Sequence, residues 1–129
     1  HINIGVFSLK KNSKCWEVWQ KNLKKTLSKG KVFGSEGLAI NIAVYHDNVE
    51  VEFLPLKCNW ITSHLLPKYD TKNDTFVEPF LPNEKIGIIH LAAGLWKNNK
   101  DMRLNKDVKV ELKTLEGKKI EKSLRFGIK

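Results

Sequence analysis

The stretch EKIGIIHLAAGLWKNN, residues 84–99, is a run of apolar residues that contains a single histidine, His90. Residues 86–92 are uncharged and rich in isoleucine, which predicts a buried strand. Such a strand would place His90 either in the core, where the imidazole only fills space, or at a functional site. The stretch alone leaves both roles open, so the segments around it have to decide between them.

The start of the chain predicts a second buried strand and then a helix. Residues 2–9, INIGVFSL, are uncharged and mostly β-branched, aromatic or otherwise apolar, which favours a strand covered on both faces. Asn12 or Ser13 can cap the helix that follows, and Gly30 can end it. The face that we expect to be buried carries Trp16, Trp19, Leu23 and Leu27. A basic helix that lies on a membrane surface with its tryptophans is the alternative to core packing.

A second helix and another strand are expected next. Ser35 can cap this helix, and Glu36 then lies in the first turn, where the helix dipole favours a carboxylate. The apolar run continues to Tyr45 and is broken at His46. Residues 49–54, VEVEFL, alternate between apolar and acidic residues, which predicts a strand with one face in water.

The remaining segments complete an expected α/β architecture. Residues 55–85 contain all four prolines and predict a long irregular segment, which is uncommon unless it is functional. Residues 108–126 predict a hairpin around Glu116 and Gly117. The expected fold is therefore a partial mixed sheet with two helices plus a C-terminal β-hairpin. We expect a main part over residues 1–107 and the hairpin tail over residues 108–129.

The composition favours a cytoplasmic protein. The 129 residues are 41% hydrophobic, which suffices for a core. Cys15 and Cys58 are too few for a disulfide scaffold, and this indicates a reducing compartment. No apolar run approaches the roughly 20 residues of a membrane helix. Because the chain begins with His1 and its only methionine is Met102, we expect a piece of a longer protein.

The net charge of +9 is distributed unevenly along the chain. Residues 1–31 carry eight lysines and one acidic residue, a net charge of +7. Residues 32–96 carry four lysines and eight acidic residues (−4), and residues 97–129 carry eleven basic and five acidic residues (+6). Basic flanks favour an anionic partner such as nucleic acid, an anionic lipid or a nucleotide. Lysines that only maintain solubility are the alternative.

Four motifs follow one another between residues 3 and 97. They are NIGVFSL at 3–9 with NSKCW at 12–16, SEGLAIN at 35–41, FLPLKCNW at 53–60 and IIHLAAGLWK at 88–97. Taken together and in this order, they resemble the C-terminal half of a glycosyltransferase of the GT-A type, closest to the retaining family-eight group. Each motif alone would be weak, and the shared order makes the resemblance specific.

The resemblance implies sugar transfer from a nucleotide diphosphate sugar to a carbohydrate or lipid acceptor, with a divalent metal, Mn²⁺, as cofactor. A metal that bridges the phosphates would act as a Lewis acid on the leaving diphosphate, and a neutral imidazole can join carboxylates around it. The resemblance assigns His90 to the metal, Glu36 and Asn3 to the catalytic site, and Gly94, Lys97 and Asn41 to substrate binding. For each of them an ordinary structural role is the alternative.

The chain also departs from the family pattern. Gly37 stands where the family has a glutamine, Gly94 comes one residue late after His90, and residues 108–126 match nothing in the family. The D-x-D motif that binds the nucleotide sugar is absent from the 129 residues. We therefore expect a fragment whose N-terminal half is missing and which is inactive alone. The alternative is a non-catalytic basic module that binds an anionic partner; nucleic acid is not expected as a partner of the enzyme, and a peripheral membrane contact stays open.

Overall fold

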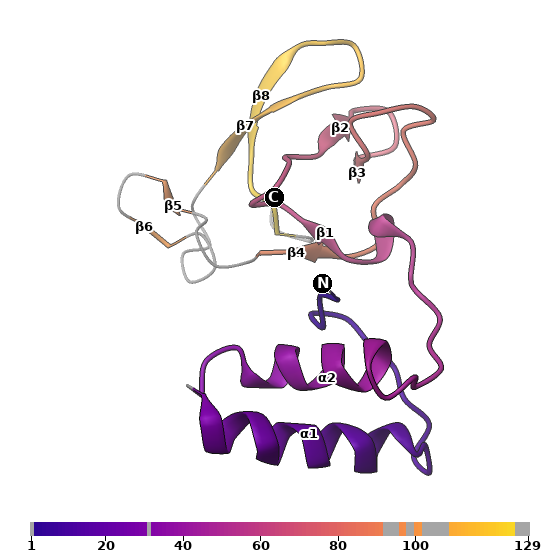
Figure 1. Ribbon diagram of the computed structural model, residues 1–129. Helices are drawn as coiled ribbons and strands as arrows, with labels where there is room; N and C mark the ends of the chain where they lie inside the picture. Colours follow the sequence, from indigo (N-terminus) through magenta and orange to yellow (C-terminus); the bar gives the residue numbers. More distant parts are fainter. Residues whose placement is uncertain (1, 31, 92–95, 98–99, 102–108, 126–129) are drawn as a thin grey trace. The chain divides into compact units, whose positions relative to one another are not determined.

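The computed structural model consists of two compact units, residues 1–53 and 54–129 (Figure 1). The structure describes residues 2–30, 32–91, 96–97, 100–101 and 109–125. Within these residues the first unit holds both α-helices and the second holds the strands. The expected mixture of two helices with short strands is confirmed, whereas the division expected at residue 107 falls outside the described residues.

The first unit is a helical hairpin formed by α1 (Cys15–Lys29) and α2 (Ser35–Tyr45), which lie side by side (Figure 1). Both predicted helices are confirmed, but the predicted buried face of α1 is wrong in part. Trp16 is 42% exposed and Leu27 is 43% exposed. The residues that α1 buries are Cys15, Asn22 and Thr26.

Two polar residues can be buried on α1 because each finds a hydrogen-bond partner. The Asn22 amide nitrogen donates to Asp47 Oδ2 at 2.7 Å. The Thr26 hydroxyl lies 3.0 Å from the Leu23 carbonyl and 3.4 Å from the Ser35 carbonyl, and it can donate to either. The spacing of apolar residues alone therefore could not identify the buried face.

The core of the first unit is small. Its buried members are Cys15, Ile40 and Ala43, and the partly buried residues Ile4, Leu9, Val18, Trp19 and Val49 pack against them. The Trp19 ring also stacks on Trp16, with 5.9 Å between the ring centroids, and meets the Phe7 ring edge-on at 5.4 Å. Aromatic contacts at the edge of the core thus extend a cluster that has few large buried side chains.

Two segments predicted as strands are not strands. Residues 2–9 and 49–54 have no strand partner in the described structure, and Phe53 is 62% exposed. A strand needs a neighbour for its backbone N–H and C=O groups. Instead, the Asn41 side chain accepts a hydrogen bond from Ile2 N at 2.8 Å and donates one to the Ile2 carbonyl at 3.2 Å.

The helix starts also differ from the predicted caps. Gly34, not Ser35, occupies the N-cap position of α2 with φ 85°, and Ser35 is the first helical residue and buried. Lys14 is the N-cap residue of α1 and makes no side-chain cap hydrogen bond. The Ser13 hydroxyl still accepts a hydrogen bond from Cys15 N at 3.2 Å, so it satisfies one donor of the first turn.

In the second unit, the described residues form four two-stranded sheets and one short 3₁₀ helix, η1 (Leu56–Cys58). β1 (Trp60–Ile61) pairs in parallel with β4 (Ile89–His90). The antiparallel pairs are β2 (Lys68–Asp70) with β3 (Thr75–Val77), β5 (Trp96–Lys97) with β6 (Lys100–Asp101), and β7 (Val110–Lys113) with β8 (Lys119–Lys122).

The structure corrects the prediction for the middle of the chain and confirms it for the tail. Within the described part of the strand predicted over residues 86–92, residues 86–91, only Ile89 and His90 form a strand. The segment predicted as irregular contains three short strands. The predicted hairpin is confirmed as β7 and β8. Gly117 takes φ 82° in its turn, a conformation that glycine adopts without strain.

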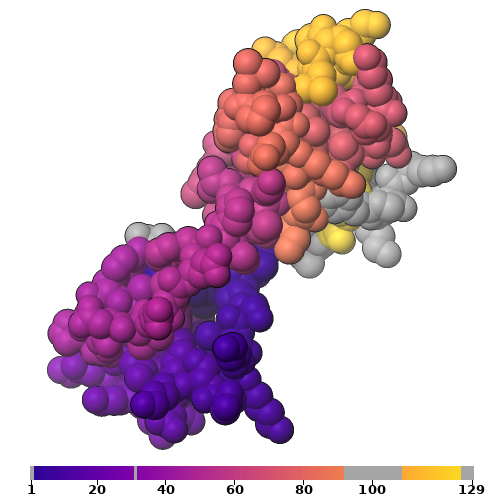
Figure 2. All heavy atoms as spheres, turned by 90° about the vertical axis from the view of Figure 1, so that its right-hand side faces the viewer, coloured from indigo at the N-terminus to yellow at the C-terminus, as the bar shows by residue number. Residues whose placement is uncertain are grey.

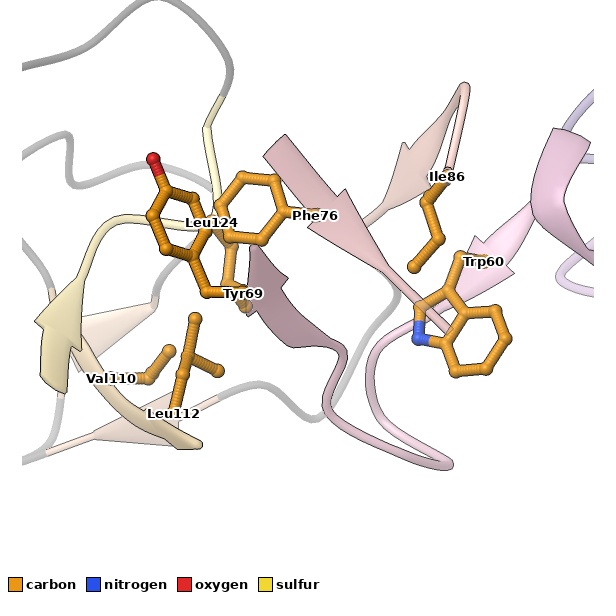
Figure 3. Packing of buried hydrophobic residues seen from close by; sticks show 7 residues of the cluster. All are labelled: Trp60, Tyr69, Phe76, Ile86, Val110, Leu112 and Leu124. Atoms are coloured by element: carbon orange, nitrogen blue, oxygen red, sulfur yellow. The ribbon is translucent and has the colours of Figure 1, made fainter. Parts of the chain in front are cut away.

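Among the described side chains of the second unit, one hydrophobic cluster joins β1, β2, β3 and β7 (Figure 3). It contains Trp60, Tyr69, Phe76, Ile86, Val110, Leu112 and Leu124. Backbone contacts support this packing: the Leu115 N–H donates to the Tyr69 carbonyl at 3.1 Å, and Val77 forms a bridge with Lys85. In the space-filling view the yellow atoms of the hairpin lie against the rose atoms of the β2–β3 segment (Figure 2).

Substitutions two residues apart test the importance of this cluster. Ile86 is 0% exposed and Ile88 is 43% exposed. We expect Ile86→Ala to lower the free energy of unfolding by roughly 3 kcal/mol, because it leaves a cavity among the packed rings, and Ile88→Ala to lower it by less than about 1 kcal/mol. Urea unfolding followed by tryptophan fluorescence measures both. Equal losses would contradict the assigned core.

The two glycines around the start of α2 should respond in opposite directions to alanine. Gly34→Ala should destabilise by about 1 kcal/mol because Gly34 has φ +85°. Gly37→Ala should stabilise by roughly 0.5–1 kcal/mol, since Gly37 is helical and an added Cβ meets nothing within 4 Å. Thermal unfolding followed by circular dichroism tests the pair, and the same sign for both would contradict the conformation of the turn.

Candidate functional site

The predicted site residues lie in both units. Asn3, Glu36 and Asn41 belong to the first unit, and His90 and Lys97 belong to the second. Lys97 lies in β5, where the structure describes the backbone but not the side chain. Gly94 lies outside the described residues, so its predicted role stays a prediction.

His90 is held at the end of β4 by both its backbone and its side chain. It pairs with Ile61 of β1 in the parallel ladder. Its carbonyl lies 3.3 Å from the Thr62 backbone nitrogen and 3.2 Å from the Thr62 hydroxyl, and both donate to it. The half-buried imidazole lies with Nδ1 2.9 Å from Asn59 Oδ1.

The contact with Asn59 decides which imidazole nitrogen is available to a ligand. An amide oxygen can only accept, so the neutral His90 ring donates through a proton on Nδ1. Nε2 then carries the free lone pair. This is the arrangement in which a second residue orients a metal-ligating histidine and fixes its tautomer.

Asn59 is carried to His90 by the backbone around η1. The Asn59 N–H donates to the Leu56 carbonyl at 2.9 Å. The Lys57 carbonyl accepts from Gly87 N at 2.8 Å and from Ile88 N at 3.3 Å, which ties the end of η1 to the segment before β4. These bonds bring together residues that are about 30 positions apart in the sequence.

A surface ion pair lies beside this backbone junction. Lys57 Nζ is 2.7 Å from Glu84 Oε2, and the Glu84 hydrogen bond raises the pKa of the Lys57 amine. Both side chains are substantially exposed, so the pair contributes little to stability. Because the Glu84 carboxylate neutralises the Lys57 ammonium group, the pair places no net charge next to η1.

The His90 imidazole fits one position in the coordination of a divalent metal. Its Nε2 lone pair is a suitable donor for Mn²⁺ or similar ions. Among the residues that the structure describes, no three His, Cys, Asp or Glu side chains gather where they could hold a metal ion together. The further ligands of such a metal would therefore have to come from other parts of the protein.

In the first unit Asn41 binds the residue that precedes Asn3. The Asn41 amide binds both backbone groups of Ile2, and its nitrogen also lies 2.7 Å from the Gly37 carbonyl. Asn3 Oδ1 accepts a hydrogen bond from Gly5 N at 2.8 Å. Asn41 thus positions the chain that carries Asn3, while its own predicted contact with a substrate stays a prediction.

Glu36 lies in the first turn of α2, as predicted, and its side chain is exposed. Its backbone carbonyl accepts a hydrogen bond from the Trp19 indole at 3.2 Å. A carboxylate at this position is free to face a ligand, and the helix N-terminus favours its charge.

Sequence reasoning missed the link between Asn59 and His90 as well as the contact of Thr62. The available signal was the Asn59-Trp60 pair at the start of β1, because a short strand there can pair with the strand that carries the histidine. His46 and His64, which belong to none of the four motifs, are both exposed. His46 does contact Asp47, whose pKa is lowered by hydrogen bonds first from Asn22 and then from His46.

Comparison of the chain with protein-family models, with curated proteins and with solved structures finds no match. Within the described parts of the chain, no helix is long and apolar enough to cross a membrane. A function therefore has to be argued from the residues themselves.

Replacing Asn59 should allow the proton of the neutral His90 ring to occupy either ring nitrogen. We expect neutral His90 to carry its proton on Nδ1, and Asn59→Ala to give a mixture of both tautomers because the acceptor is gone. Nitrogen-15 NMR of the histidine rings measures this directly. Asn73→Ala, which removes an amide bonded to Asp70 in another turn of the same unit, should leave the His90 signals unchanged. A proton on Nε2 in the unsubstituted protein would contradict the assignment.

Proposed function

We propose that the chain is part of a metal-dependent glycosyltransferase of the retaining GT-A type. It would contribute to sugar transfer from a nucleotide diphosphate sugar to a carbohydrate or lipid acceptor, together with an N-terminal half that binds the nucleotide. One observation carries the proposal. Asn59 and His90 come from two of the four motifs, and their side chains are hydrogen-bonded across the junction of β1 and β4.

This contact supports the proposal because it gives the histidine a suitable chemical form. A divalent metal, when bound, would supply Lewis-acid stabilisation of the leaving diphosphate. His90 would hold the ion through Nε2. Asn59 would keep the proton on Nδ1, and Thr62 would fix the backbone of His90 through its two hydrogen bonds.

The residues of the first unit would act on the sugar. Glu36 would accept a hydrogen bond from a sugar hydroxyl or face the positively charged anomeric carbon. Asn3 would orient a hydroxyl group, and Asn41 would position Asn3 through its hold on Ile2. Lys97 would place its ammonium group on the β-phosphate, and Gly94 would take part in substrate binding.

The test is an assay of the full-length gene product with nucleotide diphosphate sugars and Mn²⁺, beside the 129-residue chain. We expect activity that chelation abolishes in the former and none in the latter. His90→Ala should lower the activity by about 100-fold and Asn59→Ala by about 10-fold, because a ligand and then its orienting group are lost.

His64→Ala is the matched control, since His64 is exposed in a turn of the same unit. It should leave the activity unchanged. Equal activity of the His90 and His64 variants, metal-independent transfer, or a full-length gene product without a D-x-D motif would overturn the proposal.

A further inference from the structure

The turn between α1 and α2 presents apolar side chains to water. Phe33 is 94% exposed and Val32 is 79% exposed, and Leu27 in the last turns of α1 is 43% exposed. Single exposed apolar residues are common on protein surfaces. Here Val32 and Phe33 lie in the segment that connects α1 to α2, and Leu27 lies in the last turns of α1 before it (Figure 1). Such a cluster marks a surface that meets an apolar or amphipathic partner.

The turn that carries these side chains is tied by hydrogen bonds. Gly30 N donates to the Thr26 carbonyl at 2.8 Å, and Ser35 N donates to the Val32 carbonyl at 3.2 Å. Gly34 closes the turn in the left-handed conformation, and its carbonyl accepts from Leu38 N at 2.9 Å. These bonds order the backbone next to Val32 and Phe33, so little backbone conformational entropy would be lost when the two exposed side chains bind.

The surroundings of the turn are basic. Residues 18–35 contain five lysines and no acidic residue. Lys24, Lys25 and Lys29 in the second half of α1 are exposed. The nearest acidic residues in the sequence, Glu17 and Glu36, lie outside this stretch. Positive charge around protruding apolar side chains complements an anionic lipid surface, where lysines meet phosphates and apolar groups enter between the headgroups.

We propose that the α1–α2 turn docks on an anionic membrane surface, with Phe33 and Val32 inserted at the headgroup level and Lys24, Lys25 and Lys29 on the lipid phosphates. Phe33 offers the only ring among these three side chains, and the aliphatic side chains of Val32 and Leu27 favour lipid over a row of stacked bases. The docking surface goes beyond the proposed sugar transfer and needs neither a metal nor a nucleotide sugar.

The test is co-sedimentation of the 129-residue chain with phosphatidylcholine vesicles that do or do not contain phosphatidylglycerol. We expect binding only to the anionic vesicles and weaker binding at high salt. Phe33→Ser should reduce the partition coefficient about tenfold. Phe53→Ser is the matched control, because Phe53 is 62% exposed in the same unit but follows the acidic residues Glu50 and Glu52. It should bind as the unsubstituted chain does.

Charge reversal tests the lysines separately. Lys24→Glu combined with Lys25→Glu should reduce partitioning roughly 10- to 30-fold. Lys10→Glu combined with Lys11→Glu changes the net charge equally before the other end of α1 and should have a much smaller effect. Thermal unfolding shows that each variant is folded.

The outcomes separate the alternatives. Equal binding to neutral vesicles, equal losses in the paired variants, or no vesicle binding at all would overturn the proposal. Binding to duplex DNA but not to anionic vesicles would replace the lipid by nucleic acid. Because vesicle binding is measured without donor sugar or metal, its failure leaves the proposed sugar transfer untouched, and the reverse also holds.

Discussion

The parallel pairing of β1 with β4 is the constraint on which the candidate site of the second unit depends. Only two residues of each strand pair, yet the carbonyls of Lys57, Ile88 and His90 accept the hydrogen bonds that hold the two segments together. Trp60 and Ile86, which flank this junction, belong to one buried cluster (Figure 3). Apolar packing therefore supports a short ladder that would be marginal alone, and the ladder in turn sets the orientation of the histidine.

The first unit is organised differently. Hydrogen bonds of polar side chains connect its segments, whereas apolar packing connects those of the second unit. Asn41 satisfies the backbone of Ile2, and Asn22 and Thr26 connect α1 to the ends of α2. A small core is then sufficient for a helical hairpin. Because this core is small, Val32 and Phe33 in the turn lie outside it and are exposed to a partner.

The sequence predicted those features that depend on neighbouring residues. Both helices and the tail hairpin follow from local periodicity and turn glycines such as Gly117. The strands at 2–9 and 49–54 could not be judged, since a strand exists only with a partner that the segment itself does not specify. For the same reason the hydrogen bond between Asn59 and His90 could not be predicted from the sequence. It depends on the register of two segments that are about 30 residues apart. The motif order directed attention to His90, whereas its chemical form came from the geometry.

The bond from His90 to Asn59 has a consequence for the direction from which a partner can reach the ring. With Nδ1 engaged, Nε2 is the nitrogen of the neutral ring that offers a lone pair. A partner that donates to the ring therefore has to approach in the ring plane from the Nε2 side. The β1–β4 ladder fixes the backbone of His90 and Asn59 fixes its ring, so this direction of approach is set before any partner arrives.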